Sequence, residues 1–206
     1  MYPDIYTADE TPIYTFPLTT AFRMDDDVKL RMHLDCVSAL KSVLSGSSSE
    51  IVASFSSIAT CKRCEGSYCG GFDPVKREIV ICENHGLSKD EIRHTLRHEC
   101  VHALDHANGT DFANPSERAM SEIRASRFSG ECDLVSELRR WPISRWYEMY
   151  KSRDGDRSCV RRRSVASVRM ALRDERPDSS SSDLQARAAS VVDAVFDEAY
   201  LDGVES

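Results

Sequence analysis

Two histidines and a glutamate near the middle of the chain have the spacing of a zinc-binding helix. His98, Glu99 and His102 form the pattern H-E-x-x-H. Side chains four residues apart lie on the same face of a helix, so both imidazoles can reach one ion. A catalytic zinc keeps one coordination position for water, and Glu99 would lie beside that water to accept its proton. We therefore predict one catalytic Zn²⁺, with His98 and His102 as ligands and Glu99 as the general base.

The third zinc ligand has two candidates in the sequence. Glu122 lies on the next predicted helix, and a reversal between the helices would return its carboxylate to the metal. Two histidines and one glutamate are the ligand set of thermolysin-like enzymes. Asp105 shares the helical face of His102, so it is the alternative third ligand or the acceptor for the second N–H of a ligand histidine. We favour Glu122 on spacing and reach.

Other polar residues near the motif have less defined roles. His94 and His106 continue the four-residue series, but each step turns the side chain by about 40°, so we expect surface histidines. His106 is also a candidate for the active-site cleft. The sequence offers Arg124 and Tyr147 as candidates for stabilising the oxyanion.

The two helices that would carry the metal ligands have clear start signals. Ser88 is the N-cap in a capping box at the start of a helix over 89–107. Asn114 and Pro115 suit the N-cap and first helical position of a helix over 115–129. These segments should be two consecutive, well-formed helices.

The remaining segments predict an α+β, mostly helical domain. Residues 77–82 are β-branched and read as a strand, which a turn at Asp73–Pro74 would join to Gly71–Phe72 in a hairpin. The apolar run at 51–59 fits a strand or a helix. Residues 1–27 read as a flexible arm and 28–202 as a single domain, with further helices at 28–44, 132–150, 158–174 and 183–201.

Composition narrows the possible functions and locations. The chain has 206 residues, of which 41% are hydrophobic and 30% charged, as in ordinary globular proteins. A net charge of −7 argues against sequence-blind nucleic-acid binding. The sequence contains no run of about 18 apolar residues, so it predicts no membrane span. The first residues have neither a signal-peptide nor a transit-peptide pattern, which by itself favours the cytosol.

The eight cysteines point toward an oxidising compartment instead. Cys61 and Cys64 form a C-x-x-C pair, and with Cys69 and Cys82 they could bind a structural zinc. No second C-x-x-C is present, so we favour disulfides. Their pairing does not follow from the sequence.

Several blocks of sequence resemble one known family, the ATP synthase assembly and processing metallopeptidases of the mitochondrial inner membrane. Their order and spacing are similar over roughly residues 30–202. The blocks are Cys61-x-x-Cys64, Gly70–Asp73, Ile79–Asn84, His98–Asp105, Ser121–Ala125, Ser129–Cys132, Cys159–Arg161 and Val192–Phe196. Cys69 and Cys100 depart from the family pattern, and position 199, often cysteine in relatives, is alanine. The remaining cysteines are the candidates for disulfides: Cys36, Cys61, Cys64, Cys82, Cys132 and Cys159.

The resemblance implies a zincin-like fold and a specific biological setting. Family members lie in the mitochondrial intermembrane space, peripherally on the inner membrane, and are imported through the disulfide relay without a presequence. They process the precursor of ATP synthase subunit a and assist assembly of the membrane sector. We therefore expect a zinc endopeptidase with a protein substrate and no nucleic-acid partner.

Two other functions remain open at this stage. One is an assembly chaperone whose zinc site is structural or vestigial, and the other is a reduced, cytosolic zinc-binding module with eight free thiols. For the peptidase, we hypothesise that the strand at 77–82 pairs with an extended substrate.

Overall fold

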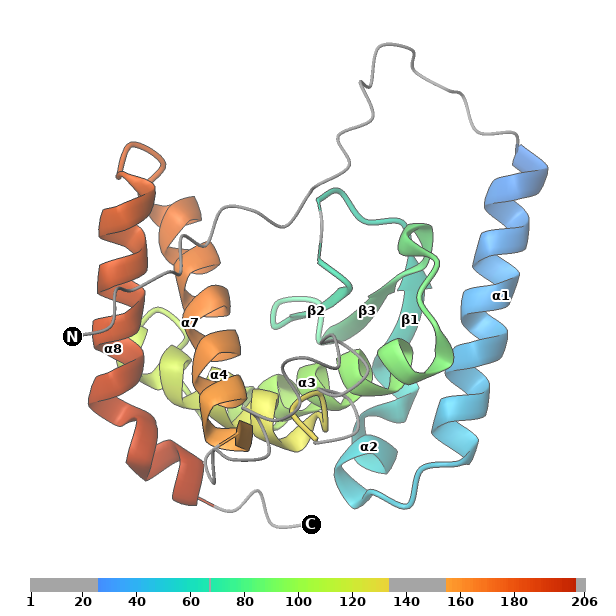
Figure 1. Cartoon of the computed structure of the whole chain (residues 1–206). Helices are drawn as coiled ribbons and strands as arrows, with labels where there is room; N and C mark the ends of the chain where they lie inside the picture. Colours follow the sequence, from blue (N-terminus) through green and yellow to red (C-terminus); the bar gives the residue numbers. More distant parts are fainter. Residues whose placement is uncertain (1–25, 67, 134–154, 203–206) are drawn as a thin grey trace.

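The computed structural model describes residues 26–66, 68–133 and 155–202, arranged as a small sheet between groups of helices (Figure 1). The elements along the chain are α1 (Asp26–Ser45), α2 (Glu50–Phe55), the 3-10 helix η1 (Ser56–Ile58), β1 (Ala59–Lys62), β2 (Gly70–Asp73), β3 (Glu78–Cys82), the 3-10 helix η2 (Glu83–His85), α3 (Lys89–Ala107), α4 (Pro115–Phe128), α7 (Gly155–Glu175) and α8 (Ser181–Leu201). Helices dominate and the sheet is short, which confirms the α+β, mostly helical class.

The three strands form one sheet in the order β1-β3-β2. The expected hairpin is present, because β2 pairs antiparallel with β3, with Phe72 opposite Ile79. β1 pairs with β3 in parallel, so β3 lies in the centre with both edges occupied. The hypothesis that 77–82 pairs with substrate is therefore wrong, since a central strand has no free backbone groups to offer.

The structure decides between the two alternatives for the apolar run before β1, in favour of helix over most of its length. The run at 51–59 resolves into α2, the 3-10 helix η1 and the first residue of β1. Ser49 accepts a hydrogen bond from the Val52 N–H and so starts α2 as a helix. Cys61, the first cysteine of the C-x-x-C pair, is a buried residue of β1.

The two helices predicted to carry the metal ligands have the bounds that their caps predict. Ser88 and Glu91 make both bonds of the capping box at the start of α3, and Asn108 ends the helix. At α4, Asn114 accepts from the Ser116 N–H and Pro115 is the first helical residue. The backbone of Gly109, with φ +90°, turns the chain between the two helices.

The other helices are close to their expected positions. α1 begins at Asp26, so the last two residues of the predicted arm over 1–27 are helical, because Asp26 and Asp27 suit the positive end of a helix. The rest of the predicted arm lies outside the described residues. α7 and α8 begin a few residues before 158 and 183. Residues 131–133 form a turn, and the rest of the helix expected at 132–150 lies outside the described residues.

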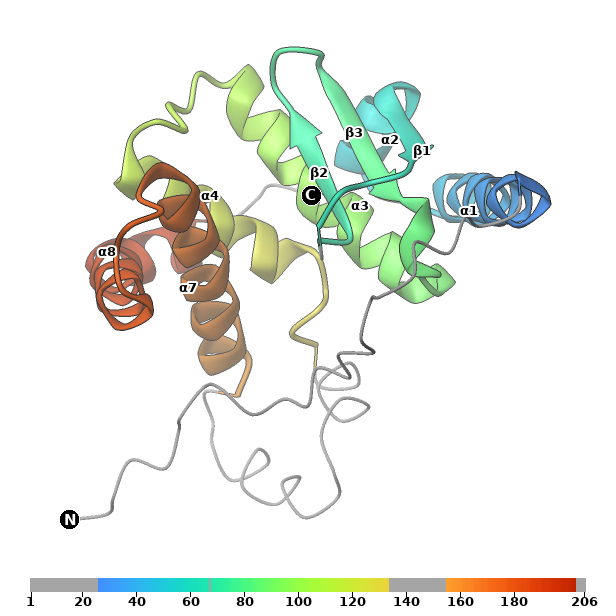
Figure 2. The same ribbon diagram turned by 90° about the horizontal axis from the view of Figure 1, so that it is seen from above.

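Buried side chains form two hydrophobic clusters that meet at the contact between α3 and α4. One lies among α1, α2, the sheet and α3, with Ile79, Ile81 and Leu96 fully buried. The other joins α4, α7 and α8 around Leu172 and Val192. Figure 2 shows the sheet above α3, with α1 on one side and α7 and α8 on the other.

Three disulfides tie these parts together, and they use the six cysteines expected. Cys36–Cys61 links α1 to β1, Cys64–Cys82 links the loop before β2 to β3, and Cys132–Cys159 links the turn after α4 to α7. Loops of this length make each bond worth about 3 kcal/mol. The bonds argue against a cysteine-bound zinc and against a module with eight free thiols. No helix in the described part of the chain has the length and apolar character needed to cross a bilayer.

The disulfide pattern predicts the reactivity of the two remaining thiols. Cys69 is exposed, whereas Cys100 is buried, and its burial, together with the charge of Glu99, raises its pKa to about 12. Without reductant, we expect one iodoacetamide adduct on the native protein and two after denaturation, measured by intact mass. Cys69→Ser should lower each count by one. Additional adducts on the unreduced, denatured chain would contradict the three disulfides.

Candidate metal centre

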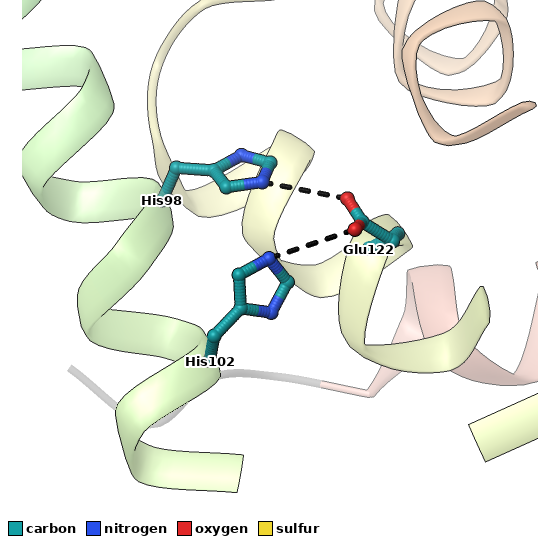
Figure 3. A group of neighbouring side chains, drawn as sticks. All are labelled: His98, His102 and Glu122. Atoms are coloured by element: carbon teal, nitrogen blue, oxygen red, sulfur yellow. Dashed lines mark ion pairs between the residues drawn. The ribbon is translucent and has the colours of Figure 1, made fainter. Parts of the chain in front are cut away.

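Two imidazoles from α3 and one carboxylate from α4 converge at a single point (Figure 3). His98 Nε2 lies 3.4 Å from Glu122 Oε2, and His102 Nε2 lies 3.7 Å from Glu122 Oε1. One ligand atom from each of the three residues lies within 4.8 Å of the others. In the described part of the chain, these three make up the group of histidine, cysteine and acidic side chains able to hold one ion.

The loop between α3 and α4 sets how the carboxylate returns to the imidazoles. The Thr110 N–H donates to Asp105 O at the end of α3. Glu117, in the first turn of α4, accepts from the Asp111 N–H, and Arg118 Nε donates to Phe112 O. These bonds use the backbone groups of the short loop, so α4 starts at a defined place beside α3.

Ser121 orients one of the two imidazoles and was not found by sequence reasoning. Its hydroxyl is fully buried and lies 2.8 Å from His102 Nδ1. When Nδ1 donates to this hydroxyl, Nε2 carries the lone pair that faces Glu122. Phe112 packs edge-on against the same ring. The only sequence signal was its position beside Glu122, which places it on the same turn of α4.

Burial and charge give the group a clear electrostatic character. Burial lowers the pKa of His98, but the contact with Glu122 and the charges of Glu99, Glu122 and Glu131 outweigh it and raise this pKa to about 9. Burial raises the pKa of Glu122, but the charges of His102 and His98 and the contacts with His98 and Ser167 outweigh it and hold this pKa at about 2. The site therefore favours a cation between these side chains.

The donor set fits a zinc ion. Oε2 of Glu122 is buried and has no hydrogen-bond donor among the described residues, although it faces His98. An unpaired buried carboxylate oxygen is costly, and a cation would satisfy it. Two imidazole nitrogens and one carboxylate oxygen are a known ligand set of catalytic zinc.

Glu99 lies beside this group and is only 8% exposed. It lines a cleft of about 240 Å³ whose walls also include Phe72, His102, Phe112 and Glu122. The carboxylate of Glu99 thus lines the same cleft as His102 and Glu122.

Asp105 and Arg124, two sequence-based candidates, lie away from the metal group. Their side chains pair with each other, with Arg124 Nη2 3.0 Å from Asp105 Oδ2. Asp105 is therefore outside the group of three, and Ser121, not Asp105, contacts the second nitrogen of His102. Arg124 also faces Asp202 and does not line the cleft that contains Glu99, so it is not placed to stabilise an oxyanion there.

The remaining candidates have mixed outcomes. Tyr147 lies outside the described residues. His106 is partly buried, with its ring 5.6 Å from that of Phe72, and His94 is also partly buried, so neither is a plain surface histidine. Sequence reasoning missed Arg118, which lines the cleft and is held by Glu175 at 2.7 Å.

Comparisons with known proteins identify a peptidase family. The peptidase M76 family profile matches residues 25–204, and the chain belongs to this family. It is 34% identical to the mitochondrial inner membrane protease ATP23 homolog of Xenopus laevis over 69% of this chain and 55% of the relative. It is 32% and 34% identical to the corresponding Danio rerio and Yarrowia lipolytica proteins, over 69% of this chain and 51% of each relative. The chain thus spans about half the length of these curated relatives. No solved structure matches it.

Zinc uptake by the metal-free chain should release about one proton from His98 at about pH 7.5, in addition to the proton that zinc-bound water loses. His98 holds its proton below a pKa of about 9, and a ligand nitrogen must be neutral. Glu122, with a pKa of about 2, is already ionised and releases none. The apparent affinity for zinc should therefore rise with pH and level off above about pH 9. Titration calorimetry in buffers of different ionisation enthalpy measures the released proton.

His94→Gln is the matched control for this measurement. His94 lies one turn before His98 on α3, and burial lowers its pKa, so it is neutral at the same pH. The variant should release the same number of protons as the wild type. Zinc binding without proton release would show that His98 is not a ligand.

Proposed function

We propose that this chain is a zinc endopeptidase with a zincin-like domain. The observation that carries the proposal is the convergence of His98, His102 and Glu122 beside a buried carboxylate, Glu99, in an open cleft. His98, His102 and Glu122 would hold the ion. When bound, zinc polarises the scissile carbonyl and lowers the pKa of water to about 7.

The residues of the chain account for the remaining chemistry. Glu99 accepts a proton from the attacking water and delivers it to the leaving amine, as a general base and then a general acid. Ser121 is a positioning residue that keeps Nε2 of His102 turned toward Glu122. Arg118 lines the same cleft and replaces Arg124 as the cation for the developing oxyanion.

The sheet has an edge strand with which a substrate could pair. This strand is β2 and not β3. β2 pairs with β3 on one side, and no strand of the described residues pairs with its other side. Phe72 of β2 and the adjacent Pro74 line the cleft with Glu99. An extended peptide that adds to this edge would lie across the metal group.

The family and the names of its relatives support a proposal for the biological setting. These relatives are mitochondrial inner membrane proteases. The three disulfides suit an oxidising compartment such as the intermembrane space. We propose that the chain acts there, peripherally on the inner membrane, on the precursor of ATP synthase subunit a, and that it assists assembly of the membrane sector.

Substitutions should separate metal binding from catalysis. Glu99→Gln should keep zinc, measured by metal analysis, and lower kcat on fluorogenic peptides by roughly 10²–10⁴-fold, because it removes the proton acceptor but no ligand. His98→Ala and Glu122→Ala should lose zinc. Asp105→Asn should retain it, with circular dichroism to verify folding. Full retention of zinc by Glu122→Ala, with loss in Asp105→Asn, would make Asp105 the third ligand.

The same Glu99→Gln variant tests the chaperone alternative. It should fail to yield the mature form of subunit a when it replaces the wild-type chain in mitochondria. If ATP synthase nevertheless assembles normally, assembly depends on the folded chain and not on cleavage.

A further inference from the structure

A second and larger cavity lies at the C-terminal end of α3. We call it the helix-end pocket; its volume is about 500 Å³, and its walls include Phe55, Ile58, Phe72, Ala103, His106 and Ala107. The set joins α2, η1, β2 and the last turns of α3. Ser54, Arg77 and His106 are its polar wall residues, the other walls are apolar, and the metal group uses none of these residues.

The helix-end pocket adjoins the cleft that contains the metal group. Phe72 is a wall of both cavities, and the Phe72 ring lies 5.6 Å from that of His106. His106 in turn faces Phe112 of the metal cleft, with ring centroids 6.5 Å apart. A peptide bound at the metal group can therefore reach the pocket past this aromatic border.

The pocket exists because α3 carries small side chains where it faces α2. Ala103 is buried, whereas Ala107, one turn further on, is exposed to the cavity. Larger side chains at these positions would occupy the space between α3 and the aromatic ring of Phe55. The side chains of Ala103 and Ala107 are single methyl groups, so they leave this volume open.

We propose that the helix-end pocket binds a bulky apolar side chain of the substrate close to the scissile bond, so that the chain prefers leucine, phenylalanine or similar residues there. This inference rests on the proposed peptidase function. The helix-end pocket would be a specificity site, made chiefly by Phe55, Ile58 and Ala107. It would take no part in the chemistry.

A peptide that pairs with the edge of β2 would direct one of its side chains into the helix-end pocket. Phe72 pairs with Ile79, whose side chain is fully buried on the α3 side of the sheet. Alternate side chains of a peptide added to β2 would point to that same side. The volume lies within the range of roughly 300–1,000 Å³ that is usual for ligand pockets. The apolar part of the wall would penalise a charged side chain that loses its water there, and Arg77 would in addition repel a basic one.

The test fills the pocket from its exposed side. Ala107→Leu adds volume at the cavity wall and avoids the more buried Ala103. Peptides that differ only in an alanine, leucine or phenylalanine near the scissile bond are compared as substrates. We expect kcat/KM for the leucine and phenylalanine peptides to fall by roughly 10–200-fold, with little change for the alanine peptide. Ala166→Leu, at an exposed position of α7, is the matched control and should alter none of these values.

A binding measurement makes the test independent of turnover. In the Glu99→Gln background, calorimetry should show that the wild-type pocket binds the phenylalanine peptide more tightly than the alanine peptide. Ala107→Leu should remove this difference. An equal loss for all peptides, or no change in preference, overturns the specificity pocket while the peptidase proposal stands. Absence of cleavage by the zinc-loaded wild type would overturn the peptidase proposal itself.

Discussion

The contact between α3 and α4 is the constraint on which the rest of this structure depends. It brings the carboxylate of Glu122 within 3.4 Å of His98 and 3.7 Å of His102, in a largely buried place. Like the imidazoles, this carboxylate is costly to bury without a partner. The surrounding fold must therefore hold the three side chains together in this largely buried place, and a cation that they share would remove the cost of burying the carboxylate.

Two hydrophobic clusters hold this contact from opposite sides. The sheet and α1 pack behind α3, and α7 and α8 pack behind α4. The site lies where the clusters meet, so a shift of either cluster would separate the histidines from the glutamate. Cys36–Cys61 and Cys132–Cys159 each reinforce one side of this arrangement. The short sheet adds the open edge of β2 and the two cavities that border Phe72.

The buried polar residues around the site divide into two groups with different tasks. Ser121 contacts His102 and turns it toward Glu122. Asp105 and Arg124, only one turn of helix away from these residues, neutralise each other and help to hold α3 against α4. The residue types and position of Asp105 and Arg124 resemble those of a catalytic pair. Their side chains contact each other and are outside the group of three, so their role is structural.

Local sequence signals determined much of this protein. The capping box at Ser88, the N-cap at Asn114 and the spacing of His98, Glu99 and His102 all act within a few residues, so they set helix bounds and a shared helical face before any tertiary packing. Tertiary structure decided that Glu122 and not Asp105 lies beside the two imidazoles, which disulfide partners pair, and that β3 is the central strand. Each of these depends on distances between residues far apart in the sequence, and such distances are fixed only when side chains such as Ile79 and Leu172 pack into their clusters.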